Sequence, residues 1–542
     1  MAKAAFDLQP SDIRGKAPTI AVVLGDQLDA NSPALNALDR DRDAVVMMEV
    51  DEEATLGPSH RQRTAVFFSA MRHFALDLRD KGYRVRYTTA DNRSNTHSLT
   101  GEVERAAKAL HAERIVLVQP GDWRVMKAAE QWEQLTGTEV DILEDTHFTC
   151  SLEDFNDWAQ GRKELTMEYF YRERRRALGI LVDDDGKPEG EQWNFDKENR
   201  ETFGKDGPNA PPPMRFRPDD VTQEVVDLVK SRYPDAPGNL DTLDWPVTHA
   251  EARRLLHDFV DNRLRDFGPY EDAMWTGQYW LFHSHLSVAL NLKLLDPRDC
   301  IEAAVKAYEK NRAAINSVEG FIRQIIGWRE YIRGVYWREG PGYRDRNHLD
   351  QHGDLPDFYW TGDTDMRCLK ECIKPVLDHA WNHHIPRLMV TGNFALIAGV
   401  EPRQVGDWYF GMYADAVDWV TTPNTIGMAM YADGTEKRGP VVATKPYAGS
   451  ANYINKMSNF CKHCRYDHKA RTGERDKGPA CPFNTFYWDF LIRNEDQFKG
   501  NNRMAMMMKN VARLEKEEKI SIRVSATSLR KKLGIGDIDT KN

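Results

Sequence analysis

The sequence predicts an N-terminal doubly wound α/β domain with a parallel sheet, followed by a larger all-α domain that contains a cysteine-based metal site. Three observations support this fold class. Short apolar runs alternate with helical patterns over the first 145 residues, helical patterns dominate from residue 248, and cysteines cluster between residues 461 and 481. A chain of 542 residues is long enough for two or three domains.

The expected α/β domain spans residues 1–150. Its five apolar segments are typical of parallel strands and lie at 19–24, 44–50, 84–87, 114–118 and 140–143. Between them, residues 64–79 and 101–111 have helical spacing. Ligands of such sheets bind beyond the carboxyl ends of the strands, which points to residues 24–27 and 49–53. Neither segment is a glycine-rich phosphate loop, so a nicotinamide dinucleotide is not expected here.

Residues 151–245 are expected to connect the two domains. They include a polar loop at 182–192 and a proline-rich stretch at 208–218. Four arginines within 172–176 form a basic cluster beside Tyr169 and Tyr171. Two interpretations of this cluster stay open, an exposed helix face and a patch that contacts nucleic-acid phosphates.

Residues 246–542 are expected to form the all-α domain, with the clearest helices at 316–337, 366–382 and 402–419. The chain has 14 Trp, and 10% of its residues are aromatic. Many of the aromatic residues lie between Trp328 and Trp488, which indicates either a large aromatic core or a planar cofactor with aromatic neighbours.

The formal net charge of −10 argues against a protein that coats nucleic acid nonspecifically, although a locally basic face is compatible with it. The sequence has no apolar run of membrane-spanning length, and residues 1–11 have no apolar signal region. We therefore expect a soluble cytoplasmic protein that has no membrane partner.

Cys461 and Cys464 have the spacing of two ligands to one metal centre, and Cys481 follows after a short basic loop. A proline directly after the last cysteine is typical of iron–sulfur ligand runs. The fourth ligand is expected from Cys368 or Cys372. Because His463 lies nearby, the spacing alone leaves iron–sulfur and zinc equally open.

Four segments of the helical half resemble the flavin-binding core of photolyases and cryptochromes. They occur in the family's order behind an α/β domain, at residues 283–287, 321–331, 383–387 and 413–424. The nearest resemblance is to the bacterial iron–sulfur branch, the prokaryotic (6-4) photolyases. It extends from residues 24–28 to residues 481–488 and is carried most clearly by the strings at 165–172, 318–330 and 391–395.

The resemblance implies three cofactors, namely FAD, a 4Fe–4S cluster and the antenna 6,7-dimethyl-8-ribityllumazine. It assigns the cluster to Cys368, Cys461, Cys464 and Cys481, which moves the prediction from zinc to iron. Asp26 and Glu53 are the candidate antenna partners. The implied FAD residues are His283, Ser284, Leu286 and Ser287 at the phosphates, Gln324, Trp328 and Arg329 along the flavin or lesion cavity, and Arg387, Asp415, Thr421 and Asn424 at the ring. Trp408 and Trp360 fit the family's electron-transfer chain.

The implied function is light-driven repair of (6-4) photoproducts in double- or single-stranded UV-damaged DNA, by electron transfer from excited reduced FAD. Repair also needs a proton, and His384 is the expected donor because histidine exchanges a proton near neutral pH. His383 is expected to orient it. Leu388 stands where animal relatives have a second histidine, so Tyr447 and Tyr453 are candidates to share the acid work. We expect a monomer that contacts DNA through residues 172–176 and 182–192.

Two alternatives remain within the resemblance. A blue-light photoreceptor would use the same flavin residues without repairing DNA. A cyclobutane-dimer photolyase is disfavoured, because those enzymes typically have Asn at the place of His384 and Glu near the place of Gln324. Val417 and Thr421 also depart from relatives that have Tyr and Glu there, which leaves the rate of flavin photoreduction open.

Overall fold

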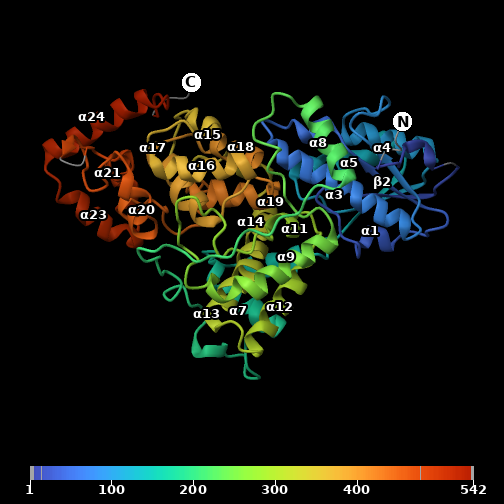
Figure 1. Cartoon of the computed structure of the whole chain (residues 1–542), viewed down its shortest axis with the longest axis horizontal. Coiled ribbons are helices and arrows are strands. Elements are labelled where there is room, and N and C mark those ends of the chain that lie inside the picture. Colours follow the sequence, from blue (N-terminus) through green and yellow to red (C-terminus); the bar gives the residue numbers. More distant parts are fainter. Residues whose placement is uncertain (1–4, 14, 476–477, 539–542) are drawn as a thin grey trace.

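The protein is described by a computed structural model over residues 5–13, 15–475 and 478–538, and the polar chain end beyond residue 538 lies outside the described residues. Figure 1 shows the N-terminal α/β domain at one end of the molecule, in blue, and the C-terminal helices at the opposite end, in red. A body of helices lies between them. The predicted division into an α/β part and a largely helical part is confirmed.

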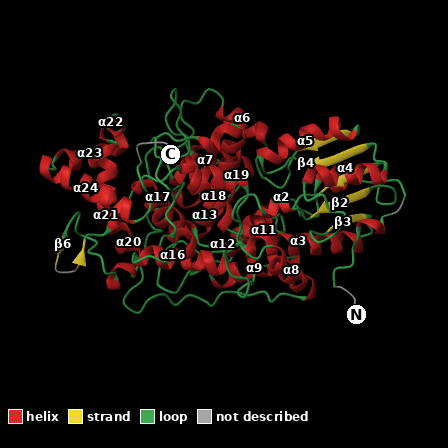
Figure 2. Cartoon of the chain, turned by 90° about the horizontal axis from the view of Figure 1, so that it is seen from above, coloured by secondary structure: helices red, strands yellow, loops and turns green. Residues whose placement is uncertain are grey.

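The N-terminal domain contains a five-stranded sheet of order β3-β2-β1-β4-β5, and every pairing is parallel. All five strands fall where the apolar runs predicted them: β1 (Thr19–Val22), β2 (Ala44–Met48), β3 (Val85–Thr88), β4 (Arg114–Val118) and β5 (Glu139–Leu143). The helices of this domain are α1 (Pro33–Asn36), α2 (Asp51–Ala54), α3 (Arg61–Asp80), α4 (Leu99–Leu110) and α5 (Trp123–Thr136). Figure 2 shows the strands edge to edge among these helices.

The central strands β1 and β2 are almost entirely apolar and buried, because both faces of the sheet are covered there. In β2, Val45 and Met47 pack into the same core as α3, whereas Val46 and Met48 pack into the core formed with α4 and α5. Successive side chains of a strand point to opposite faces, so a strand buried on both sides reads as a continuous apolar run.

The segment 151–245 contributes to both domains and is more than the connection that its composition predicted. It forms α6 (Leu152–Ala159), α7 (Met167–Leu178) and α8 (Asp220–Arg232). α8 packs on α3 of the α/β domain, whereas α7 packs against the π-helical turn η3 (Arg323–Arg329) of the helical half.

The C-terminal half is helical apart from a short antiparallel ladder of β6 (Glu474–Arg475) and β7 (Gly478–Pro479). Its helices are α9 (His249–Asn262), α10 (Leu264–Phe267), α11 (Ser287–Asn291), α12 (Pro297–Glu309), α13 (Ile315–Ile322), α14 (Glu330–Glu339), α15 (Phe358–Thr361), α16 (Arg367–His379), α17 (Asn393–Ala398), α18 (Pro402–Met412), α19 (Asp418–Thr422), α20 (Ala451–Met457), α21 (Pro482–Arg493), α22 (Glu495–Phe498), α23 (Ala505–Ala512) and α24 (Lys516–Lys532). Two further π-helical turns, η5 (Pro386–Gly392) and η6 (Pro423–Ala429), pack on each other.

The helix expected at 402–419 is interrupted. α18 ends at Met412, and Tyr413 has extended backbone angles of φ −108° and ψ 133°. The extended residues place the side chain of Asp415 beside Arg387 of η5, and the carbonyl of Asp415 accepts a hydrogen bond from Asn291 of α11. The helical pattern of this segment is therefore overridden by contacts with distant residues.

The α/β domain is joined to the helical half at residues 58–60. The backbone N–H of His60 donates to the carbonyl of Gly411 at 2.8 Å. A side chain at position 411 would overlap the carbonyl of Pro58, so this close approach requires glycine.

Among the described residues, no helix combines the length and the apolar character that crossing a bilayer requires.

Candidate functional site

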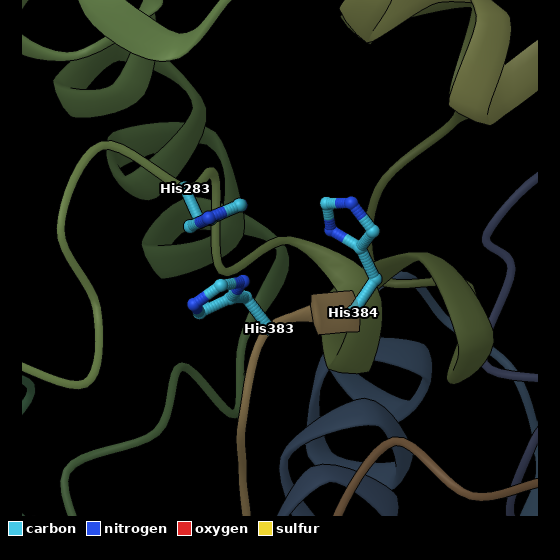
Figure 3. A group of neighbouring side chains, drawn as sticks. All are labelled: His283, His383 and His384. Carbon is cyan, nitrogen blue, oxygen red and sulfur yellow. The ribbon is translucent and has the colours of Figure 1, made fainter. Parts of the chain in front are cut away.

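Three histidines from two segments meet in the helical half (Figure 3). The ring of His283 stacks on His383 with centroids 4.0 Å apart and an interplanar angle of 17°, and His384 lies edge-on to both. One ring nitrogen from each histidine lies within 4.8 Å of the other two. His383 and His384 follow the left-handed end of α16 at Ala380 and precede Pro386, the first residue of η5.

Burial separates the two adjacent histidines. His283 and His383 are buried, and this desolvation lowers the pKa of each imidazole well below its usual value. The side chain of His384 is 45% exposed, and its Nε2 lies 3.8 Å from Oδ1 of Asp272. His384 therefore faces solvent and a carboxylate, whereas His383 is kept as a neutral ring behind it.

Asp272 and Glu271 were not predicted as site residues, because two adjacent acidic residues in a loop do not by themselves indicate a functional site. The hydroxyl of Tyr453 donates to Asp272 at 3.3 Å, and the guanidinium of Arg200 lies 3.8 Å from the same carboxylate. Glu271 is buried, and its carboxyl oxygens accept hydrogen bonds from Gln324 at 3.1 Å and Asn199 at 3.2 Å. Desolvation raises the pKa of Glu271 to about 7.

The predicted pair of Arg387 and Asp415 is present. Two parallel hydrogen bonds of 3.0 and 2.9 Å join the guanidinium to the carboxylate, which is the strongest geometry for this pair. The Arg387 guanidinium also lies 4.1 Å above the ring of Tyr413 and donates to the carbonyl of Asn382. The pair is therefore held rigidly between η5 and the extended segment after α18.

The segment 283–287 contains buried polar atoms that lack a protein partner. His285 has a left-handed φ of 59°, and its ring lies against Trp245 and Trp280 at centroid distances of 4.2 and 3.8 Å. Within the described part of the chain, Nε2 of His283, Nε2 of His285 and the hydroxyl of Tyr413 are buried without a hydrogen-bond partner. Such groups are costly unless a ligand or water satisfies them.

The remaining predicted residues of this segment have different roles. Ser284 Oγ accepts from the N–H of Leu286 at 3.5 Å, and Trp381 donates to Ser287 Oγ at 3.4 Å. The side chain of Leu286 is buried in the core, so this residue offers a ligand its backbone only.

Several predicted flavin or lesion residues lie apart from the histidine cluster. Arg329 is buried against Phe148, with its guanidinium 4.1 Å from the ring, and donates to His147, so its contacts are with the end of the α/β domain. Trp328 packs edge-on against Tyr331. Gln324 is occupied by Glu271 and by the carbonyl of Gly320.

The last predicted residues lie on α19, on η6, in the loop before α20 and on α20 itself. Asn424 donates back to the carbonyl of Val420 in its own helical segment, and Thr421 continues the turn that begins at Val417. Tyr447 is partly buried, and this desolvation raises the pKa of its hydroxyl. Of the two tyrosines predicted to share the acid work, only Tyr453 has a hydrogen bond to the carboxylate that faces His384.

Aromatic rings connect Arg387 to the interior of the helical half. Tyr413 stacks on Tyr409 with centroids 5.3 Å apart, and both lie within 5.7 Å of Trp408. Trp408 is fully buried, and its indole N–H donates to the carbonyl of Tyr359 at 3.0 Å. Trp360, the next residue after Tyr359, is partly exposed at the end of α15.

Four cysteines from three segments line one small pocket, and they are the four that the resemblance assigned: Cys368, Cys461, Cys464 and Cys481. Cys372 is buried one helical turn from Cys368 and does not line the pocket. The rest of the lining is mostly apolar, including Ile454, Phe460 and Phe483, and also contains Tyr466 and His468. Burial, together with the neighbouring thiols, raises the pKa of Cys461 and Cys481 to about 12.

Asp26 and Glu53 lie beyond the carboxyl ends of β1 and β2, beside Arg63. Glu53 pairs with Arg124 at 2.5 Å. Asp26 lies against Gly121 of the chain segment after β4, and desolvation raises the pKa of its carboxyl. The guanidinium of Arg63 is buried between the two domains, where it donates to the carbonyl of Ala416 at 3.3 Å.

The basic cluster at 172–176 is largely structural. Arg175 is fully buried and donates to the carbonyls of Ile180 and Trp193, so the expected phosphate contact is wrong for this residue. The guanidinium groups of Arg172 and Arg176 lie over the same Trp193 ring, at 5.8 and 4.5 Å. The arginines therefore anchor the loop at 182–192 to α7.

Comparisons with known proteins agree with this arrangement. A family model described as deoxyribodipyrimidine photo-lyase-related protein matches residues 21–245. A curated (6-4) photolyase of Agrobacterium fabrum is 46% identical over 514 residues, which is 95% of this chain and 99% of the relative.

Two solved structures share the fold at low sequence identity. A bacterial class III photolyase from Agrobacterium tumefaciens has a TM-score of 0.55 and 15% identity, over 98% of this chain and 100% of that one. A cryptochrome from Synechocystis sp. PCC6803 has a TM-score of 0.54 and 14% identity, over 82% of this chain and 89% of that one. With the photolyase–cryptochrome fold and near-full-length similarity to a curated relative, the chain belongs to the (6-4) photolyase family.

Proposed function

We propose that this protein repairs (6-4) pyrimidine photoproducts in UV-damaged DNA under blue light, with FAD bound in the helical domain. The observation that carries the proposal is the 46% identity to a (6-4) photolyase over 95% of the chain. The geometry at His384 supports it, because repair needs an acid that is reachable from solvent and can be reprotonated after each turnover.

His384 acts as the proton donor in this proposal. Asp272 lies 3.8 Å from its Nε2, and Tyr453 and Arg200 keep that carboxylate in place. His383 remains neutral because it is buried, so it orients the neighbouring ring through packing and does not itself deliver the proton. A lesion flipped out of the duplex would be reached by the exposed ring of His384.

The residues of the helical half fit FAD. The buried, unpartnered nitrogens of His283 and His285 and the hydroxyl of Tyr413 offer polar contacts to a bound cofactor. The rigid pair of Arg387 and Asp415 supplies a fixed positive and negative charge for a flavin ring. FAD, when bound, reduced and excited by light, supplies one electron to the lesion. Trp408 and Trp360 are proposed to return electrons to oxidised flavin.

The four-cysteine pocket is proposed to bind a 4Fe–4S cluster. The proline directly after Cys481 and the resemblance to the iron–sulfur branch favour iron over zinc at these four thiols. Cys461, Cys464 and Cys481 lie close together in the chain, whereas Cys368 comes from the distant helix α16. A centre held by all four would join these segments, so a structural role is the simplest one.

The region around Arg63 at the carboxyl ends of β1 and β2 is proposed to bind the antenna, 6,7-dimethyl-8-ribityllumazine. Asp26 and Glu53 present carboxyl oxygens there, at the edge of the sheet where parallel α/β domains bind ligands.

We further infer that the protein acts on DNA as a monomer in the cytoplasm, next to or on the nucleoid, with substrate in double- or single-stranded form.

A repair assay on the reduced protein under blue light tests the proposal, with one oligonucleotide that contains a (6-4) photoproduct and one that contains a cyclobutane dimer. Repair of the (6-4) lesion alone is expected. His384→Ala should slow it by at least about a hundredfold, since general acids contribute about 10²–10⁴-fold. His257→Ala, on the exposed face of α9, is the matched control and should leave repair unchanged.

The flavin absorption spectrum separates the other outcomes. Repair of the cyclobutane dimer would identify the other photolyase specificity. Full flavin occupancy without repair of either lesion would identify a blue-light receptor and would overturn the proposal.

A further inference from the structure

The turn between α16 and η5 is bonded back to α16 by a side-chain amide that the proposed chemistry does not use. This amide belongs to Asn382, which is only 2% exposed. Its Nδ2 donates to the carbonyl oxygen of Cys372 on α16 at 2.7 Å. Because a carbonyl oxygen only accepts hydrogen bonds, the amide nitrogen must be the atom that faces it. A buried hydrogen bond thus joins the turn to the helix that precedes it.

This hydrogen bond spans a point at which α16 lacks a backbone donor. Pro375 lies inside the helix, between Cys372 and Asn382. Proline has no N–H group, and its ring crowds the carbonyl four residues earlier. Shortly after it the helix ends, and Ala380 adopts a left-handed φ of 52°. The Asn382 amide therefore supplies a connection across the last turn of the helix, where the backbone ladder is incomplete.

The backbone of the same residue directs Arg387. The carbonyl of Asn382 accepts from Nε of Arg387 at 2.8 Å, and the two terminal nitrogens of the guanidinium donate to Asp415. A guanidinium is planar and presents its donors in a rigid fork, so it cannot adapt to one partner without changing its geometry toward the other. A displacement of Asn382 would therefore also move Arg387 relative to Asp415.

The two adjacent histidines are held between Asn382 and Pro386. On the far side, the ring of Pro386 fixes its own φ, and η5 begins at this residue. The buried ring of His383 is held by its stacking on His283. The side chain of His384 is 45% exposed, so the position of its ring depends mainly on the backbone on either side.

We propose that Asn382 is a positioning residue, which places His384 and Arg387 relative to each other by holding the turn on α16. This inference rests on the proposed function, in which His384 donates a proton. A general acid must lie within hydrogen-bonding reach of the atom that it protonates. Loss of the amide donor should therefore slow repair without weakening the binding of DNA.

The test compares Asn382→Leu with the wild type in the full-length, flavin-loaded protein, with rates expressed per bound flavin. Leucine has a similar size but no donor, so the carbonyl of Cys372 loses its partner. The kcat for repair of a (6-4) photoproduct should fall by about tenfold or more, since a misplacement of 1 Å can cost about a hundredfold. The Kd for the damaged oligonucleotide should stay the same. An unchanged kcat would overturn the inference.

Two other variants at this position complete the series. Asn382→Gln keeps an amide donor and should recover part of the kcat that Asn382→Leu loses. A kcat in Asn382→Gln no higher than in Asn382→Leu would contradict a role of the donor. Asn382→Ser has a hydroxyl too short to reach the carbonyl of Cys372, so it should show the same loss and replaces Asn382→Leu if that protein does not fold.

NMR reports on the position of His384 without repair. In protein labelled with ¹³C at histidine Cε1, the signal of this ring is assigned by its loss in His384→Ala. It should shift or broaden in Asn382→Leu, because the ring is no longer held in one place. An unmoved signal would refute the positioning role. Failure of the proposed function is distinguishable from this result, since it would appear as full activity in His384→Ala.

Asn494→Leu is the matched control. Asn494 directly follows the end of α21, is 8% exposed, and donates from Nδ2 to the carbonyl of Phe490 in that helix at 2.9 Å. Its replacement removes the same kind of hydrogen bond and should lower the melting temperature by a comparable amount. The kcat and the His384 signal should stay at their wild-type values. Equal losses in Asn494→Leu and Asn382→Leu would show a general effect of destabilisation and would overturn the inference.

Discussion

Nε2 of His60 lies 3.0 Å from the carbonyl oxygen of Leu377, so one histidine of the α/β domain is hydrogen-bonded to α16 of the helical domain. Its Nδ1 accepts the N–H of Gln62 at 3.0 Å at the start of α3. Nε2 must therefore carry the proton, and the ring is neutral. Burial lowers the pKa of His60 to about 4.

This arrangement predicts a loss of stability in acid. A histidine whose folded pKa lies below its unfolded value of about 6.5 stabilises the fold fully above that pH, and the contribution is lost as the pH falls toward the folded pKa. From pH 6.5 to 4 the expected loss is about 3 kcal/mol for His60. The melting temperature should therefore drop more steeply with acidification in wild type than in His60→Gln. Parallel curves for the two proteins would contradict this.

Separating Arg387 from Asp415 should destabilise the protein and weaken flavin binding. Removal of one partner leaves a largely buried charge unpaired, which costs about 3 kcal/mol, so Asp415→Asn should lower both the melting temperature and the FAD content measured by absorbance. Asp407→Asn is the control, because Asp407 pairs with Arg403 on the exposed face of α18 and should cost less than about 1 kcal/mol. Comparable losses in both variants would refute this account.

Cys461→Ser should abolish cluster assembly and lower the melting temperature. The pocket brings its thiol together with those of Cys368, Cys464 and Cys481, and a centre with one ligand missing would no longer join the three segments. Cys372→Ser should keep full iron and sulfide content, because Cys372 does not line the pocket. Chemical analysis of iron and sulfide per chain decides between these expectations, and loss of iron in Cys372→Ser would show that the ligand set is wrong.

Trp408→Phe should slow the photoreduction of oxidised flavin by about tenfold or more, with little effect on repair by protein that has been reduced chemically. The indole is the buried ring between Tyr409, Tyr413 and Tyr359. Its removal also leaves the carbonyl of Tyr359 unpaired, at a cost of about 1–3 kcal/mol. Trp488→Phe, outside this group of rings, should photoreduce at the wild-type rate. Slow repair by the prereduced Trp408→Phe protein would indicate a different role.

The strands and the cysteine ligands were predictable because their signals are local. A parallel strand that is buried on both faces is rich in apolar residues, and all five predicted segments are neighbouring strands of one sheet. The spacing of Cys461 and Cys464 by itself indicates two ligands to one metal centre. The choice between Cys368 and Cys372, in contrast, depended on the family resemblance, because both lie on α16 and only its packing shows which thiol reaches the pocket.

The basic cluster shows the limit of a charge pattern. Four arginines near each other predict either a solvated face or a phosphate site, and neither describes Arg175, which is buried among backbone carbonyls. The helix at 402–419 is a second case, since its pattern gives no sign that Tyr413 leaves the helix to bring Asp415 to Arg387. Long-range hydrogen bonds decided both outcomes.

The sequence by itself determined the order of the domains, the parallel sheet, the cysteine motif and the identity of His384 as the candidate acid, because each depends on residues close together in the chain or on a recognisable motif. Only the tertiary structure decided that Asp272 faces His384, that His383 is buried and His384 exposed, and that Gln324 is bonded to Glu271. Burial and charge contacts arise between segments that are distant in sequence, so no local pattern predicts them.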